Sequence, residues 1–297
     1  MNQVIQVQDL TKRCNDIVTV DHINFEVNEG EIFGFLGPNG AGKTTTWRML
    51  TGILNSDEGK AHILGYDIRN EPLKVKQHIG VVPEISNAYV DLSAWQNIML
   101  MAELYGIPKK EAEKRAKDLL TRLKLYDRRN YKFKGFSKGM KQRLILCMAL
   151  ISDSVLLFLD EPTGGLDVQS THLIKEILRD FANNGKTIFL TTHNMEEANQ
   201  LCERVAIINK GQIAVIDRPE MLKNRIKKLN SVEISFDKTI KVENLSGIPN
   251  IAEIKREGDK LRIYTKNIND LIASLTDFAE EHDLKIMTLN TMLPSLE

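Results

Sequence analysis

A glycine-rich loop between an expected strand and an expected helix constrains the fold of this chain most. Residues 37–45 fit the pattern G-x-x-x-x-G-K-[ST], with an apolar run at 31–36 before them and a helical pattern at 43–50 after them. Such a loop points successive backbone N–H groups at a phosphate, next to the positive end of a helix. The sequence therefore predicts a nucleotide-binding α/β core. The residues expected to bind the nucleotide here are Gly37, Pro38, Asn39, Gly40, Ala41, Gly42, Lys43, Thr44 and Thr45.

Two carboxylates follow a second apolar strand, expected over residues 155–159. Asp160 and Glu161 would then lie at the carboxyl end of a parallel strand, where ligands bind in open α/β sheets. We expect Asp160 and the Thr44 hydroxyl to hold Mg²⁺, with Lys43 on the β- and γ-phosphates of ATP. Glu161 is the expected catalytic base, because it can accept a hydrogen bond from the attacking water.

A second phosphate-binding element lies ahead of this strand. Residues 136–143 read Phe-Ser-Lys-Gly-Met-Lys-Gln-Arg and place Ser137 and Gly139 at the start of a helix. A serine hydroxyl and the free N–H groups of a helix start form an anion site. Since the chain already has a loop for its own nucleotide, this element suggests that two copies close around shared ATP.

Together these motifs resemble the ATP-binding subunit of an ABC transporter, over roughly residues 4–217. The family signature usually reads Leu-Ser-Gly-Gly-Gln, and this chain departs from it at Phe136, Lys138 and Met140. The resemblance implies that Ser137 and Gly139 contact ATP held by the opposite subunit.

Two further motifs agree with this resemblance. Residues 164–167 resemble the D-loop, so that Asp167 would link the two nucleotide sites of the dimer. His193 ends the run Thr-Thr-His and resembles the switch histidine, whose imidazole would bond the γ-phosphate and take part in catalysis. The strand before His193, expected over 187–191, would neighbour the strand that ends at Asp160.

Two positions depart from the family pattern. Glu84 follows Val-Pro where the family usually has glutamine, as in the drug-exporter-like branch, and we expect it to be a Mg²⁺ ligand. Cys14 stands where the family usually stacks an aromatic ring on adenine. A thiol offers no such face, so we expect weaker or less base-selective binding unless neighbouring apolar side chains hold the base.

The pattern of apolar residues predicts the fold class. We expect a P-loop NTPase α/β core with a mixed, largely parallel sheet, N-terminal antiparallel strands, and an inserted helical subdomain at about 86–150. Helices are expected over 95–105 and 109–125 within that insertion. The ATPase domain would span 1–228, and a small α+β accessory domain 229–297, including a strand at 284–289.

The composition limits the classes of partner and the cellular compartment that we expect for this chain. The formal net charge of the 297 residues is zero, so no global field draws the chain to nucleic acid, and we expect no nucleic-acid partner. Three widely spaced cysteines suit a reducing compartment. No apolar run approaches the roughly 20 residues that span a bilayer. We expect a cytoplasmic protein, peripheral on the inner face of the cell membrane through a membrane partner.

The resemblance implies a function and partners. The chain would be an ATP-hydrolysing subunit that energises transport, as export, together with a second ATP-binding subunit, as a homodimer, and an integral membrane transporter subunit. Tyr89, Leu92 and Trp95 are candidate contacts for that membrane subunit, although a place in the helical-subdomain core would explain them equally well. The lysine runs, 132–141 and 223–228, are interpreted as solvated surface.

The same motifs disfavour three alternative functions. An ABC ATPase of DNA repair would separate the two nucleotide motifs by a long coiled coil, and no heptads are sustained between Lys43 and Asp160. A translation ATPase of the family typically carries two cassettes in one chain, whereas this chain has one. A generic P-loop kinase or GTPase would leave the motif at 136–143 unexplained.

Overall fold

The computed structural model of the chain describes residues 2–15, 17–85, 88–226, 230–238, 240, 242–245, 247–258, 260–265 and 267–292. The chain divides into two compact units, Met1–Pro219 and Glu220–Glu297. We call them the N-terminal and the C-terminal unit. The expected domain boundary at 228/229 and the expected start of the helical insertion at residue 86 lie outside the described residues.

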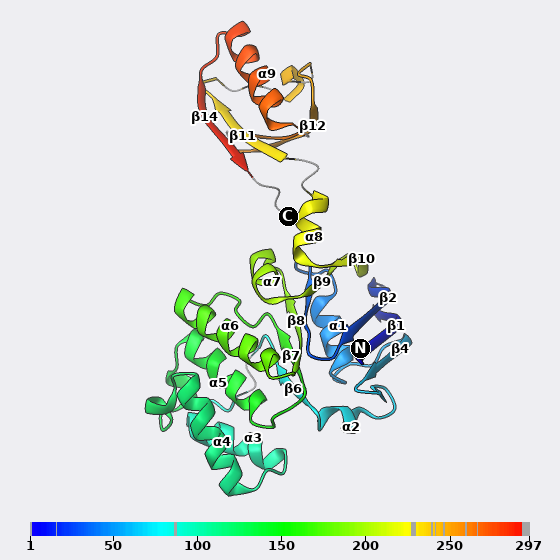
Figure 1. The fold of residues 1–297 in the computed structure, drawn as a ribbon, viewed down its shortest axis with the longest axis vertical. Coiled ribbons are helices and arrows are strands. Elements are labelled where there is room, and N and C mark those ends of the chain that lie inside the picture. Colours follow the sequence, from blue (N-terminus) through cyan, green and yellow to red (C-terminus); the bar gives the residue numbers. More distant parts are fainter. Residues whose placement is uncertain are drawn as a thin grey trace. The chain divides into compact units, whose positions relative to one another are not determined.

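A six-stranded sheet forms the centre of the N-terminal unit (Figure 1). Its strands, in order across the sheet, are β10 (Gln212–Asp217), β9 (Arg204–Asn209), β3 (Ile32–Leu36), β8 (Thr187–Thr192), β7 (Leu156–Asp160) and β6 (Ile79–Val82). Neighbours are parallel except in the β9–β10 hairpin. Strands β3, β7 and β8 are buried along their whole length, as expected for parallel strands covered on both faces.

An antiparallel sheet packs against this central sheet. It contains β2 (Ile17–Asn28), β1 (Gln3–Cys14), β4 (Glu58–Ile63) and β5 (Tyr66–Asp67), in that order. One apolar core joins the two sheets, and the rings of Phe25 and Phe33 stack in it with centroids 5.7 Å apart. The core fixes the position of β3, and therefore of the glycine-rich loop that follows it.

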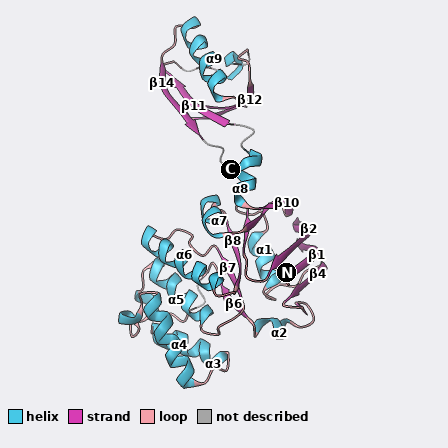
Figure 2. Ribbon diagram, in the orientation of Figure 1, coloured by secondary structure: helices cyan, strands magenta, loops and turns pink. Residues whose placement is uncertain are grey.

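Helices cover the central sheet and form the insertion (Figure 2). They are α1 (Lys43–Leu50), α2 (Pro72–Lys76), α3 (Ala94–Leu104), α4 (Lys109–Arg122), α5 (Lys138–Leu150), α6 (Val168–Asn183) and α7 (Met195–Leu201), with 3-10 turns at Tyr126–Arg128 and Phe133–Gly135. The next helix, α8 (Pro219–Ile226), begins at the boundary between the two units. The two helices expected within the insertion are present as α3 and α4, and α4 ends three residues early. Sequence patterns did not predict β4, β5 or α2.

The described residues of the C-terminal unit form an antiparallel sheet, most of α8, a 3-10 turn at Val242–Leu245 and one further helix. Its sheet order is β12 (Ile251–Glu257), β13 (Lys260–Thr265), β11 (Asn230–Phe236) and β14 (Ile286–Met292), and α9 (Ile268–Glu281) lies between β13 and β14 in the chain. A separate apolar core includes Ile234, Ile263 and Leu275. The strand expected over 284–289 begins and ends later than predicted. The predicted fold class is confirmed.

Within the described ranges, no helix is both long enough and apolar enough to span a lipid bilayer.

Candidate active site

The glycine-rich loop turns from β3 into α1 through residues with left-handed backbone angles. Gly42 caps α1 with φ +105°, and a Cβ at this position would lie 2.7 Å from the carbonyl oxygen of Thr19. Only glycine combines that angle with so close an approach of backbone. The Gly37 N–H donates to the carbonyl of Thr192 at 3.3 Å, which ties the loop to the end of β8. The loop is therefore bonded to the end of β8 and lies close to the backbone of β2.

Lys43 is buried inside this loop, with 6% of the residue exposed. Its Nζ donates to the carbonyl oxygens of Gly37 at 2.7 Å and Pro38 at 3.1 Å. The same ammonium lies 3.6 Å from Glu161 Oε1. The ammonium is thus held inside the loop by the two carbonyl oxygens. Its positive charge can bind a phosphate group there.

Asp160 ends β7 and lies beside Thr44. The Thr44 hydroxyl is 3.4 Å from Asp160 Oδ1, and the Thr191 hydroxyl of β8 donates to the same oxygen. Only 1% of Asp160 is exposed. Burial raises the pKa of its carboxyl group; the two hydroxyl groups oppose this shift, and the nearby charges of Glu84 and Glu161 add to it. No ion pair to Asp160 occurs among the residues that the structure describes, and such a buried carboxylate favours a metal ion at this place.

Glu161 lies between two basic side chains. It has φ +50°, and its N–H donates to the Thr191 carbonyl at 3.1 Å. Glu161 Oε2 is 2.9 Å from His193 Nδ1, and Oε1 faces Lys43. His193 follows β8, which is paired in parallel with β7, so the predicted neighbourhood of these two strands is confirmed. The carboxylate is therefore held from both sides with little freedom to rotate.

These side chains line one cleft of about 610 Å³. The lining residues are Thr19, Asn39, Gly40, Gly42, Lys43, Thr44, Thr45, Glu84, Ile85, Lys138, Gln142, Glu161, Gly164, Gly165 and His193. Glu84 thus shares the cleft with the loop, as its expected role requires. Sequence reasoning missed Thr19 and Gln142, and it interpreted Lys138, which also lines the cleft, as solvated surface. The spacing of Gln142 from Lys138, one helical turn, was the available signal for the second of them.

The serine-glycine turn faces elsewhere. The Ser137 hydroxyl caps α5 by accepting from the Met140 N–H at 3.3 Å. A Cβ on Gly139 would lie 2.9 Å from Asp167 Oδ2 and would overlap the Ser170 hydroxyl, so the turn packs directly on the start of α6. Among the described residues that line the cleft, Ser137, Gly139 and Asp167 do not occur. The structure does not bring them to the phosphate loop of their own chain.

Asp167 has a local partner of its own. Its carboxylate caps α6 by accepting from the Ser170 N–H at 2.8 Å and from the Ser170 hydroxyl at 2.9 Å. These two hydrogen bonds, the backbone one first, lower the pKa of Asp167. The carboxylate is therefore ionised and oriented by α6.

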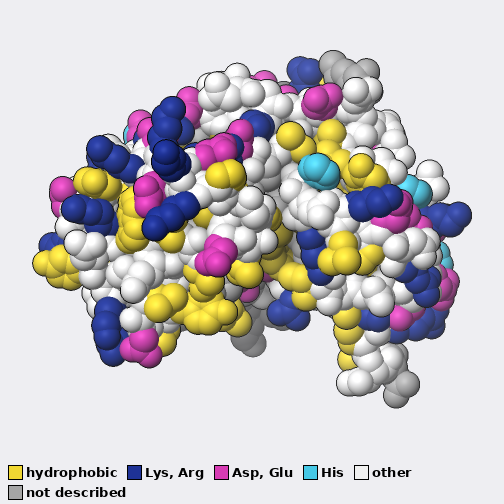
Figure 3. All heavy atoms as spheres, turned by 90° about the horizontal axis from the view of Figure 1, so that it is seen from below, with side chains coloured by type: hydrophobic (Ala, Val, Ile, Leu, Met, Phe, Trp, Pro, Cys, Tyr) yellow, Lys and Arg dark blue, Asp and Glu magenta, His cyan; other side chains and the backbone are white. Residues whose placement is uncertain are grey.

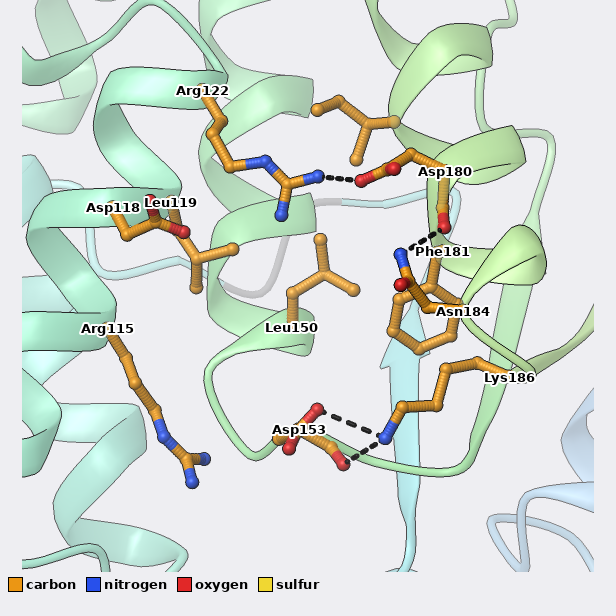
Figure 4. A pocket seen from close by; sticks show the side chains of 11 residues that line it. Arg115, Asp118, Leu119, Arg122, Leu150, Asp153, Asp180, Phe181, Asn184 and Lys186 are labelled. Carbon is orange, nitrogen blue, oxygen red and sulfur yellow. Dashed lines mark hydrogen bonds and ion pairs between the residues drawn. The ribbon is translucent and has the colours of Figure 1, made fainter.

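A second cavity, of about 300 Å³, lies between α4 and α6 (Figure 4). Arg122 of α4 pairs with Asp180 of α6 across it, and Lys186 lies 3.1 Å from Asp153. Its floor includes Leu119 and Leu150. The cavity lies between the helical insertion and the core, and none of the predicted site residues is among the described residues that line it.

Comparison with known proteins bears on the identity of this site. The family described as "ABC transporter" matches residues 20–164. The Nod factor export ATP-binding protein I of Ralstonia nicotianae is 35% identical over 94% of this chain and 87% of its own length. The chain belongs to the ABC transporter family. It is an ATP-binding subunit of that family and an ATPase, and the predicted resemblance to exporter-type subunits is confirmed.

Other relatives and solved structures agree. The linearmycin resistance ATP-binding protein of Bacillus subtilis is 33% identical, over 99% of this chain and 96% of its own length. Among solved structures, an ATP-binding subunit of an ABC transporter superposes with a TM-score of 0.70 at 28% identity, covering 75% of this chain and 92% of the other. The share of the chain that superposes on this ABC structure is about the same as the share that forms the N-terminal unit.

Proposed function

We propose that this ABC ATPase energises export through a separate membrane-spanning partner. The observation that carries the proposal is the cleft in which Lys43, Glu161 and His193 meet, since it places phosphate-binding and base groups around one space. The names of the relatives, an export and a resistance ATP-binding protein, support the direction of transport. They give no common cargo, and no observation favours a role in translation or DNA repair.

The residues of the cleft have separate roles in ATP hydrolysis. Backbone N–H groups of the loop after Pro38 and the Lys43 ammonium bind and orient the phosphates of ATP. Glu161 accepts the hydrogen bond of the attacking water as general base, and His193 holds that carboxylate in position while facing the γ-phosphate. Positioning and charge neutralisation supply most of the rate enhancement in phosphoryl transfer.

The oxygen donors of the cleft fit Mg²⁺. Thr44 and Asp160 lie 3.4 Å apart, and Glu84 lines the same space. No cluster of three or more His, Cys, Asp or Glu suited to a metal ion occurs in the described ranges. Mg²⁺ commonly binds through one or two carboxylates plus substrate phosphates and water, so this small donor set suits it. The ion would neutralise phosphate charge.

The turn at 137–139 supports a dimer of two copies. Ser137 and Gly139 lie outside the cleft of their own chain, and the signature they resemble serves the ATP of an opposite subunit. We infer a homodimer in which each Ser137 faces the nucleotide of the other copy. Asp167 packs against the same turn and would therefore couple the two nucleotide sites of the dimer.

An exposed apolar surface supports the membrane partner. Ile85, Tyr89 and Val90 are 79%, 58% and 55% exposed, and Leu73 and Leu104 are exposed as well. Figure 3 shows hydrophobic side chains gathered on the face of the N-terminal unit that it presents. Leu92 and Trp95 are half-buried, so Tyr89 is the better contact of the three expected ones. This surface would dock the transporter subunit and keep the chain at the inner face of the membrane.

The substitution Glu161→Gln tests the catalytic arrangement. It keeps the size of the side chain but removes the base, so the variant should bind Mg-ATP, stop hydrolysis and sediment as a dimer in ATP. Glu176→Gln on the exposed face of α6 is the matched control and should hydrolyse like the parent. A Glu161→Gln protein that remains monomeric in ATP and hydrolyses at the parent rate would refute the mechanism.

A further inference from the structure

Lys138 departs from the family signature and also lines the nucleotide cleft of its own chain. The signature usually has glycine at this position, and here the first residue of α5 carries a long cationic side chain. Lys138 is exposed, so its side chain is not needed for the core. The two residues on either side of it, Ser137 and Gly139, do not line the cleft in the described part of the chain.

The ammonium of Lys138 lies over the loop that follows Glu161. A Cβ built on Gly165 would be 2.5 Å from Lys138 Nζ and 3.8 Å from its Cε, so the side chain lies along this loop. Gly165 also lines the cleft, as does Gln142, one helical turn after Lys138. The lysine therefore reaches from α5 to the wall of the same cleft that the glycine-rich loop lines.

The other basic groups of the cleft already have partners. Lys43 donates to two loop carbonyls, and His193 is bonded to Glu161. By contrast, the residues that the structure describes give Lys138 neither an ion pair nor a hydrogen bond. A cation without a partner on the wall of a cleft that receives a polyphosphate gains most from the ligand, since charge-assisted hydrogen bonds to phosphate are strong.

We propose that Lys138 binds the phosphates of the nucleotide held in its own chain. The proposal rests on the ATPase function proposed above and adds a residue to it. The first turn of α5 then serves two nucleotides: Lys138 contacts the one in its own cleft, and Ser137 contacts the one in the partner copy. A single subunit consequently retains its nucleotide more tightly than the glycine of the usual signature would allow.

The test measures nucleotide binding to single subunits. A fluorescent non-hydrolysable ATP analogue with Mg²⁺ is titrated into the full chain, at concentrations where sedimentation shows monomers. Lys138→Gly and Lys138→Gln should weaken binding about tenfold at low salt, and the difference should shrink as salt screens the contact. Lys138→Arg should restore most of the affinity. Lys141→Gln, on the same helix and stacked on Phe133 at 5.5 Å, is the control and should bind like the parent.

Two outcomes would overturn the proposal. Either Lys138→Gly monomers bind the analogue like the parent, or the loss appears only once dimers form, in which case the lysine serves the partner's nucleotide. Ser137→Ala separates this result from the proposed function: it should lower ATPase activity of the dimer and leave monomer binding unchanged. If Ser137→Ala hydrolysed like the parent, the shared-site arrangement would fail, while the monomer titration would still decide the role of Lys138.

Discussion

His193 Nδ1 and Glu161 Oε2 lie 2.9 Å apart, although the two residues are 32 positions apart in the chain. Each follows a strand of the same parallel pair, β8 and β7, so the sheet itself brings them together. With Oε2 in this contact, the other carboxylate oxygen of Glu161, Oε1, faces the Lys43 ammonium. The carboxylate that we propose as the base is thereby oriented by the two groups that we propose to bind phosphate, which would link its position to the presence of ATP.

Replacement of His193 should therefore lower kcat. In His193→Ala the Glu161 carboxylate loses one of its two anchors and can rotate, and a displacement of about 1 Å costs roughly a hundredfold in rate. Phosphate release at saturating ATP measures the effect. His172→Ala, an exposed histidine on α6, is the control. A kcat for His193→Ala near that of the parent would contradict a positioning role.

Asp160→Asn should stabilise the nucleotide-free protein while it abolishes hydrolysis. The pKa of Asp160 is raised in the folded state, so the folded chain binds more protons than the unfolded chain between the two pKa values. Its contribution to stability consequently falls as pH rises through that window, and the ionised group costs free energy at neutral pH. The asparagine removes this cost.

Thermal unfolding at neutral pH and at a pH below the window measures this effect. The stabilisation of Asp160→Asn should be present at neutral pH and disappear in acid, where the parent is protonated. Asp118→Asn, exposed on α4, should change neither the melting temperature nor the rate. A lower melting temperature of Asp160→Asn at neutral pH would show that the charge is stabilising in the free protein.

Cys14→Tyr should tighten ATP binding and increase the preference for ATP over GTP. Cys14 is exposed at the end of β1, opposite Ile17 in the hairpin, and Ile17 is exposed too. Stacking of a base on an aromatic ring contributes about 1–3 kcal/mol, which the thiol cannot supply. Titration of both nucleotides into both proteins measures the change. Unchanged affinities would mean that apolar neighbours already hold the base, in which case Ile17→Ser should weaken binding.

Tyr89→Asp should release the chain from membranes without loss of ATPase activity. The charge would be placed in the exposed apolar surface around Ile85 and Val90, where docking to a membrane subunit would desolvate it. Fractionation of cells that produce the variant measures membrane association, and phosphate release measures activity. Ile53→Asp introduces the same charge at another exposed apolar position as a control. Equal membrane association of both variants would refute this surface.

The parts of the site that follow strands were predictable from sequence. Lys43 follows the glycine-rich loop after β3, Asp160 ends β7 and His193 directly follows β8, and parallel strands end at a common edge. Local pattern also indicated the β9–β10 hairpin, whose turn residues Lys210 and Gly211 both have positive φ.

The parts that depend on contacts distant in sequence were not predictable. Strand β4 contains Gly59, whose φ is +79° and whose place against the carbonyl of Asp9 no local pattern indicates. Strand β4 pairs with β1, which lies about 50 residues earlier in the chain. The direction of Lys138 likewise depends on how α5 lies against the loop at Gly165, so the sequence alone favoured a solvated lysine.

The contact of Gly139 with Asp167 and Ser170 limits how this molecule can move. A methyl group would not fit between the starts of α5 and α6, so the two helix starts cannot slide past each other without overlap. We therefore expect a displacement of one helix start to displace the other. In a dimer, the turn that leaves the partner's nucleotide after hydrolysis would carry the Asp167 loop with it, so both sites would open in the same step.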